Sequence, residues 1–348
     1  MSNRKQFTAG LDRFSGLYLW AILIIAFGFL RPSTFLTPAT VHAIASQESV
    51  QGIMALALLV CMACGQYDLS IGATANLAGL VVIQIQVEQH WAVLPAVLLG
   101  IAVGALIGLA NGFIVVRLKV NSFIATLGMS TILAAVQTIV TNSQVPAPVT
   151  APAWSNFTQT PVIGFQVVVV FLLAVAFLLW WFLDHTPAGR YIYASGGNAD
   201  AARLSGVRVD RWAWISLTIT GALSGFGGVL FTSLSGPSLT FGPALLLPAF
   251  AAVFLGSTQL TPGRFNVWGT LLAIFILATG VQGMQLVSGL QWLNDMFNGV
   301  ALILAVALAA SRIRLRGWRP RRPRPKPSAS GEEDASAAAA AAAGVHAE

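Results

Sequence analysis

Long apolar runs constrain the fold of this chain most strongly. Ten of them lie between residues 16 and 310, at about 16–30, 43–64, 69–87, 93–116, 122–141, 163–183, 212–234, 244–258, 265–287 and 294–310. A helix of about 20 apolar residues crosses a bilayer with every backbone polar group bonded internally. Only 9% of the 348 residues are charged, against 56% hydrophobic. We therefore predict an all-α membrane protein with about ten transmembrane helices.

Basic residues set the predicted orientation, because cytoplasmic loops of membrane proteins carry an excess of lysine and arginine. With ten crossings and a cytoplasmic N-terminus, 18 of the 19 basic residues face the cytoplasm, and only Arg31 lies outside. Losing one crossing between Arg13 and Arg264 would move many of them to the wrong side. Both termini are therefore predicted to be cytoplasmic. With five helices in each half, the second half is inverted relative to the first.

This topology predicts a cytoplasmic N-terminus (1–15), a transmembrane domain (16–310) with a polar cytoplasmic loop at 184–211, and a tail (311–348). The tail mixes basic residues with proline and ends in an alanine-rich stretch, so we predict disorder. Its basic part directly follows a crossing on the cytoplasmic side. That position favours contact with anionic membrane lipid over nucleic acid.

The loop at 184–211 contains the pattern of a short capped helix. Asn198 suits the N-cap, and Gly206 can adopt the left-handed conformation that ends a helix. Because two turns are not stable alone in water, we expect this helix to dock against a partner. The alternative is a solvated loop with a chance capping pattern. The residues assigned to docking are Gly197, Asn198, Ala201, Ala202, Arg203, Leu204 and Gly206.

Polar residues inside the predicted spans are mostly neutral amides. The pathway candidates among them are Asn76, Asn111, Gln137, Gln282, Gln285 and Asn298. Amides exchange hydrogen bonds with hydroxyl groups without fixing a charge, which suits a neutral, polyhydroxylated solute. The alternative, favoured for any single residue, is that they hold helices together.

The turn at 65–72 interrupts two apolar runs. Gly65 can end the first helix, and Asp68 can cap the second. An ionisable residue near membrane depth is a functional candidate, so Asp68 joins the pathway candidates. Its predicted capping role is nevertheless a sufficient explanation for it.

Glycines recur every fourth residue in the fourth run, at positions 100, 104, 108 and 112. Small residues at this spacing allow two helix backbones to approach closely in lipid. Gly221, Gly225 and Gly228 form a similar pattern in the seventh run. These residues predict close helix packing and indicate no chemistry.

Sequence motifs for catalysis are absent. The chain has no G-x-x-x-x-G-K-[ST] phosphate loop, no H-E-x-x-H and no G-x-S-x-G. Cys61 and Cys64 lie in an apolar run without a second pair or a histidine cluster to complete a metal site. We therefore expect a protein that is not an enzyme and has no cofactor.

Three segments resemble the permease subunits of bacterial sugar ABC importers of the ribose/xylose type, and the similarity covers about 46–308. The segments are Asp68-Leu69-Ser70-Ile71-Gly72, Asn111-Gly112 followed by Phe123-Ile124-Ala125-Thr126-Leu127-Gly128, and Gly189-Arg190 with Ala194-Ser195-Gly196-Gly197-Asn198 and Ala201-Ala202-Arg203-Leu204-Ser205-Gly206. Departures from the family are Gln66 in place of a second glycine, Leu246 and Pro248 near its usual acidic residues, and Ser257 in place of a glycine.

The resemblance implies a permease in a bacterial cell membrane that imports a monosaccharide or related polyol. It implies that 198–206 is the coupling helix, seated on a separate cytoplasmic ATPase subunit, and that an extracytoplasmic binding protein delivers the solute. A second permease copy or a homologous permease would complete the pathway. The alternatives are an ion-coupled secondary transporter, which would be expected to contain a membrane-embedded carboxylate, and a non-transporting scaffold.

Overall fold

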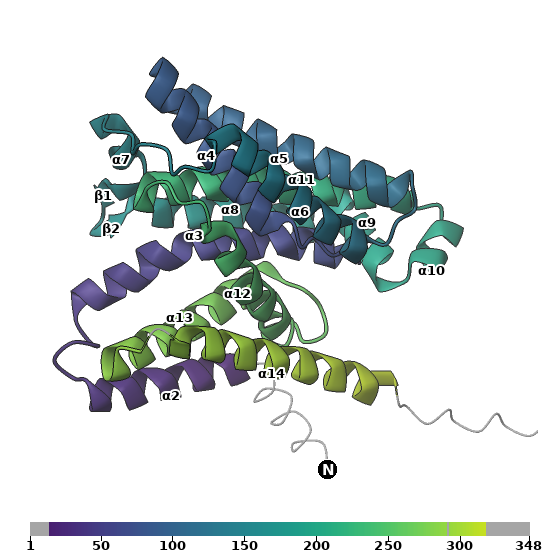
Figure 1. Cartoon of the computed structure of the whole chain (residues 1–348). Helices are drawn as coiled ribbons and strands as arrows, with labels where there is room; N and C mark the ends of the chain where they lie inside the picture. The colour runs from purple at the N-terminus through teal and green to yellow at the C-terminus, as the bar shows by residue number, and fades with distance from the viewer. Residues whose placement is uncertain (1–13, 291, 318–348) are drawn as a thin grey trace, which may run out of the picture. The chain divides into compact units, whose positions relative to one another are not determined.

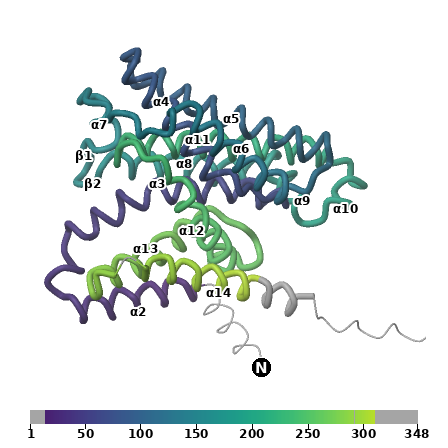
Figure 2. The backbone as a smooth tube through the Cα atoms, viewed as in Figure 1, coloured from purple at the N-terminus to yellow at the C-terminus, as the bar shows by residue number. Residues whose placement is uncertain are grey.

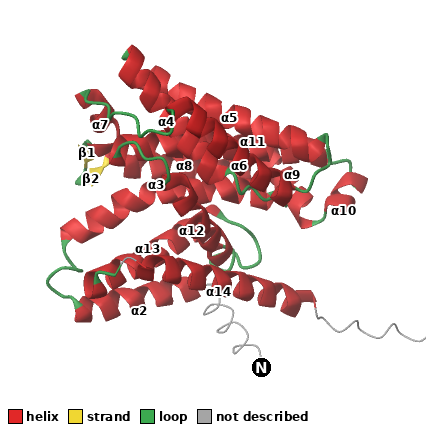
Figure 3. Cartoon of the chain, in the orientation of Figure 1, coloured by secondary structure: helices red, strands yellow, loops and turns green. Residues whose placement is uncertain are grey.

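The computed structural model describes residues 14–290 and 292–317, and this part is almost entirely helical (Figures 1 and 3). The helices are α2 (Ser15–Leu30), α3 (Pro38–Ala63), α4 (Ile71–Gln89), α5 (Val93–Val116), α6 (Ser122–Thr141), α7 (Pro152–Gln159), α8 (Val167–His185), α9 (Pro187–Gly197), α10 (Ala199–Leu204), α11 (Val209–Ser235), α12 (Phe241–Gly256), α13 (Val267–Ser288) and α14 (Trp292–Gly317). Two short strands, β1 (Pro161–Val162) and β2 (Phe165–Gln166), pair antiparallel. The chain separates into the units Met1–Ala310 and Ser311–Glu348.

Every predicted apolar run lies on a helix. In the described part of the chain, eight helices are long and apolar enough to cross a membrane. The runs at 16–30 and 244–258 correspond to α2 and α12, which have 16 residues each. At 1.5 Å per residue they are about 24 Å long, shorter than the hydrocarbon core of about 30 Å. The prediction of an all-α membrane protein is confirmed.

Three boundaries differ from the prediction by four residues or more, for local reasons. Helix α3 begins at Pro38, before the run at 43–64, because the Thr37 side chain caps it by accepting from the Thr40 N–H. Helix α8 begins at Val167, since the preceding residues form the β1–β2 hairpin.

Helix α14 continues to Gly317, so the prediction of disorder from residue 311 is wrong for 311–317. The first proline of the tail is Pro320, and nothing before it prevents a helix. Residues 318–348 lie outside the described part.

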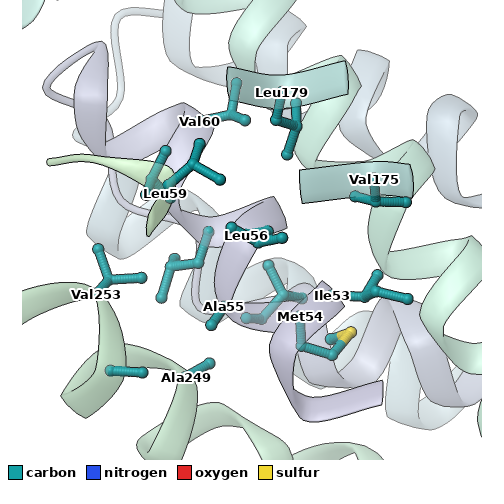
Figure 4. Close-up of a cluster of buried hydrophobic side chains, with 14 of the residues drawn as sticks. Ile53, Met54, Ala55, Leu56, Leu59, Val60, Val175, Leu179, Ala249 and Val253 are labelled. Atoms are coloured by element: carbon teal, nitrogen blue, oxygen red, sulfur yellow. The ribbon is translucent and has the colours of Figure 1, made fainter. Parts of the chain in front are cut away.

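Helix α3 forms the centre of the hydrophobic core, and every residue from Ser49 to Ala63 is buried. A helix that is apolar on all sides is stable only when neighbours surround it. Figure 4 shows Val175 and Leu179 of α8 near one part of α3, and Ala249 and Val253 of α12 near another.

Helices α5 and α11 pack side by side along the predicted glycine faces (Figure 2). A Cβ on Gly104 would collide with the Gly221 carbonyl oxygen, and one on Gly225 with that of Gly100. Only glycine permits these backbones to lie so close. The close packing predicted from the glycine spacing is confirmed.

The two halves of the described helices exchange their packing partners. Helix α11 packs on α4 and α5, whereas α3 packs on α12 and α13. Helices α4 and α12 meet near their first turns, where Gly72 and Gly242 each face the carbonyl oxygen of the other. Helix α4, which follows α3, therefore packs on α11, and helix α12, which follows α11, packs on α3.

Candidate functional site

The polar loop at 184–211 folds into two consecutive helices, α9 and α10. The sequence analysis predicted α10 and missed α9. Thr186 caps α9 by accepting from the Gly189 N–H, and Pro187 is its first residue. A threonine followed by proline is a start signal for a helix, and this pair could have revealed α9.

Helix α10 has the predicted capping geometry. The Asn198 side chain accepts a hydrogen bond from the Ala201 N–H at 3.0 Å. Gly206 has a φ of 84°, and its N–H bonds to the Arg203 carbonyl. Arg203 also pairs with Asp210 at 2.9 Å, although both side chains are more than half exposed. Such an exposed pair is worth at most about 1 kcal/mol, so the caps and packing determine the helix.

The structure corrects the prediction for one residue of the docking surface, Ala202. Ala202 is only 6% exposed, because α10 packs against α9 and α11. It therefore stabilises the loop from within and presents no side chain to a partner. Ala201 is exposed, and Leu204 is 91% exposed. The exposed apolar surface of α10 consists of these two residues.

The last turn of α9 lies against the end of α3. A Cβ on Gly196 would overlap the Ala63 carbonyl oxygen, and a Cβ on Gly65 would lie 3.2 Å from the Gly196 Cα. Gly65 itself has a φ of 78°, as expected for a residue that ends a helix. This glycine contact, formed by Gly65 and Gly196, connects the loop at 184–211 to the most buried helix.

A second contact connects α9 to the turn between α12 and α13. Tyr193 donates from its hydroxyl to the Phe265 carbonyl at 2.7 Å. The Arg264 guanidinium carbon lies 3.7 Å from the centroid of the Tyr193 ring, and this side chain also pairs with Asp184 at 2.8 Å. Burial raises the pKa of Tyr193 to about 12, so the hydroxyl remains a donor at physiological pH. We call this group the tyrosine contact.

The turn between α3 and α4 positions Asp68 differently from the prediction. Ser70, and not Asp68, is the N-cap residue of α4. The Asp68 carboxylate accepts from the Ser70 backbone N–H at 2.8 Å and from the Ser70 hydroxyl at 2.6 Å. Asn111 donates to the same hydroxyl oxygen at 2.9 Å. All three residues are buried, and they form a structural connection between this turn and α5.

Two of the predicted amides line a cavity of about 460 Å³ between α4, α6 and α12. The amide nitrogens of Asn76 and Gln137 both donate to the Leu239 carbonyl, at 2.7 and 2.8 Å. Asn76 also donates to the Gln137 side-chain oxygen. The Asn76 Oδ1 is buried without a hydrogen-bond partner in the described part of the chain.

The remaining amides lie elsewhere. Gln282 and Gln285 are half-buried on α13, and Asn298 is half-buried on α14. None of them lines the cavity between α4, α6 and α12. The structure therefore brings Asn76 and Gln137 together, places Asn111 in the Asp68 turn, and leaves the other three apart. The cavity also has hydroxyl groups, from Ser130, Thr131 and Thr240, that the sequence analysis did not identify.

Known proteins of similar sequence are transport permeases. Residues 40–306 match the family described as branched-chain amino acid transport system/permease component. The chain is 34% identical over 321 residues to the ribose import permease protein RbsC of Escherichia coli strain K12, with 88% of this chain and 96% of the relative covered. It is 31% identical over 301 residues to the fructose import permease protein FrcC of Rhizobium meliloti, with 84% and 83% covered. No solved structure matches the chain significantly.

The match covers the transmembrane helices from α3 through most of α14 and the loop at 184–211. A likeness over most of both sequences, in relatives that are all permeases, identifies a transport subunit and not an enzyme. The chain belongs to the branched-chain amino acid transport system/permease component family and is a multi-pass membrane permease subunit of an ABC importer.

Proposed function

We propose that this permease imports a monosaccharide or related polyol, and that a separate cytoplasmic ATPase drives it through the loop at 184–211. Three relatives support a sugar as the solute, because they are named for ribose import, fructose import and D-allose transport. No phosphate-binding loop exists in the chain, so the energy comes from a partner. An extracytoplasmic binding protein delivers the solute.

The exposure of Leu204 carries the proposal for the ATPase. This large apolar side chain is 91% exposed on a helix that is capped at Asn198. A single exposed leucine is ordinary, but this one lies on a loop connected to the protein core by the glycine contact and the tyrosine contact. A partner that moves α10 would therefore transmit force to α3 and to the α12–α13 turn. Gly197, Asn198, Ala201, Arg203, Leu204 and Gly206 form the proposed docking surface.

The cavity lined by Asn76 and Gln137 is the proposed part of the solute pathway. Its amide and hydroxyl side chains offer hydrogen bonds without a net charge, which suits a neutral polyol. A second copy of the chain, or a homologous permease, completes the pathway. Gln282, Gln285 and Asn298 remain candidates for lining a part of the pathway that forms only in the assembly.

We further propose ten crossings with both termini cytoplasmic and two inverted halves. The four residues Leu69-Ser70-Ile71-Gly72 have a counterpart 170 residues later in Leu239-Thr240-Phe241-Gly242. Both segments lead into the helices that meet at Gly72 and Gly242. The exchanged packing of α3 and α11 supports the same relationship. On this topology the tail at 311–348 faces the cytoplasm, where its basic residues contact anionic lipid.

Co-purification tests the functional proposal. The tagged permease, expressed with its neighbouring genes, should retain an ATPase subunit. ATP hydrolysis should appear only in the joined complex. Hydrolysis by the isolated permease, free of contaminants, would contradict the proposal.

Site-directed labelling tests the topology. In a chain with Cys61 and Cys64 replaced, a cysteine at the exposed position of Leu204 should react only from the cytoplasmic side. Labelling of this position from outside would overturn the ten-crossing arrangement.

A further inference from the structure

A groove of about 900 Å³ lies between the end of α5 and the beginning of α11. Its lining residues are Leu109, Val116, Arg117, Lys119, Asp210, Arg211, Trp214, Ile215, Thr218 and Ile219. It lies apart from the cavity near Asn76 and adjoins α10, because Asp210 in its lining pairs with Arg203. Neither the proposed solute pathway nor the proposed ATPase contact uses it.

The groove has two chemically different ends. Three basic side chains, Arg117, Lys119 and Arg211, lie where the helices meet the polar loops. The apolar residues follow along the helices, because Ile215 and Ile219 of α11 are one turn apart on the same face. This is the polarity of a phospholipid, with a charged headgroup beside an acyl chain.

The basic end has a net positive charge that no described side chain neutralises. Among the residues described, none of Arg117, Lys119 and Arg211 forms an ion pair, and all three are exposed. The one carboxylate of the groove, Asp210, is bonded to Arg203 at 2.9 Å. The positive end of the α11 dipole also favours an anion here. Charge complementarity therefore selects an acidic ligand.

Trp214 connects the two ends of the groove. Its indole nitrogen Nε1 is buried without a hydrogen-bond partner in the described part of the chain, and the Arg117 guanidinium carbon lies 5.9 Å from the ring centroid. That nitrogen faces Gly112 of α5, because a Cβ there would lie 2.7 Å from it, so Trp214 borders the groove with its ring and not with its N–H. Tryptophan commonly lies at the level of lipid headgroups.

We propose that this groove binds an acidic phospholipid, with its phosphate at Arg117, Lys119 and Arg211 and an acyl chain along Ile215 and Ile219. Basic pockets between transmembrane helices on the cytoplasmic side bind anionic headgroups in this way. The bound lipid would fill the space between α5 and α11 next to the loop at 184–211.

Native mass spectrometry of the delipidated full-length chain tests the proposal, with phosphatidylglycerol and phosphatidylcholine as the two probes. We expect wild type to prefer phosphatidylglycerol. Arg117→Gln/Arg211→Gln should weaken its binding by about 25-fold, because each basic residue near a membrane surface contributes about fivefold. The matched control Arg190→Gln/Arg208→Gln removes two exposed charges outside the groove and should bind like wild type.

Bromine-labelled acyl chains locate the lipid. Phosphatidylglycerol brominated on its acyl chain should quench wild-type tryptophan fluorescence, and Trp214→Phe should lose a measurable part of that quenching. Equal affinity for the two lipids, or equal loss in both double variants, would overturn the proposal. Unchanged quenching in Trp214→Phe would overturn it too.

Discussion

Gly196, in the last turn of α9, lies backbone to backbone against Gly65, which follows the end of α3. A side chain at Gly196 would overlap the Ala63 carbonyl, whereas a Cβ on the neighbouring Gly197 meets nothing within 4 Å. These adjacent glycines are therefore a matched pair. One maintains the contact between the loop and the core, and the other tolerates a larger residue.

Gly196→Ala should lower solute uptake per molecule, because a methyl group separates α9 from α3 at a cost of about 1–3 kcal/mol. Gly197→Ala should retain more uptake than Gly196→Ala, because its Cβ meets nothing within this chain, although the residue belongs to the proposed docking surface. Uptake in cells, normalised to the amount of permease in the membrane, measures both. Equal loss in the two variants would contradict the glycine contact as its cause.

Leu204→Asp should weaken the association with the ATPase by about 30-fold, because it removes an apolar residue at the proposed interface that we expect to contribute about 2 kcal/mol. Leu204→Met keeps a similar apolar volume and should bind nearly as well as wild type. Affinity measured with the purified ATPase subunit separates the two. If Leu204→Asp bound normally, α10 would be a solvated helix without this role.

Ala202 leads to a different expectation, since it is buried inside the loop. Ala202→Trp should disrupt the packing of α10 on α9 and α11 in the isolated permease, at about 1–3 kcal/mol. Limited proteolysis of the purified chain should show faster cleavage at 198–208 than in wild type. A variant with wild-type cleavage would show that Ala202 is not packed inside the chain.

Tyr193 predicts a pH dependence of stability. Burial raises its pKa from 10.0 to about 12. Its contribution is therefore fully present below pH 10 and is lost as the pH rises towards 12, because the unfolded chain ionises first. The thermal stability of wild type should fall more steeply than that of Tyr193→Phe between pH 10 and 12. Parallel pH profiles would show that the hydroxyl is not buried in the native state.

Asn111 and Gln137 should respond differently to the same substitution. Asn111→Leu removes the bond to Ser70. An average hydrogen bond in a bilayer contributes about 0.6 kcal/mol to the free energy of unfolding, and close packing is lost as well, so the folded amount should fall. Gln137→Leu removes bonds to Leu239 and Asn76 and should also lower the folded amount, but in addition it should reduce uptake per folded molecule, since Gln137 lines the cavity. Size-exclusion yield and uptake per molecule distinguish these outcomes. If Asn111→Leu reduced uptake per molecule and Gln137→Leu lowered only the folded amount, Asn111 would be the pathway residue and Gln137 the structural one.

Local sequence patterns predicted much of this architecture. The apolar runs located the helices, and the spacing of Gly100, Gly104 and Gly108 predicted the close approach of α5 to α11. Asn198 and Gly206 predicted α10 because capping depends on neighbouring residues alone.

Contacts between distant residues could not be predicted in the same way. Gly196 and Gly65 are 131 residues apart, and nothing local indicates that they meet. The amides looked equivalent in the sequence, and both Asn76 and Asn111 are buried, yet Asn76 borders a cavity and Asn111 bonds to Ser70. Their roles depend on which helices surround them. The burial of Ala202 likewise depends on α9, which the sequence analysis missed.

Reconstituted transport tests the central claim most directly. The permease is placed in liposomes with its ATPase subunit and binding protein, and uptake of radiolabelled ribose, fructose and allose is measured with and without ATP. We expect uptake of at least one sugar that requires ATP and all three components, and no uptake driven by a proton or sodium gradient. Uptake by the permease alone under an ion gradient, unaffected by ATP, would contradict the account.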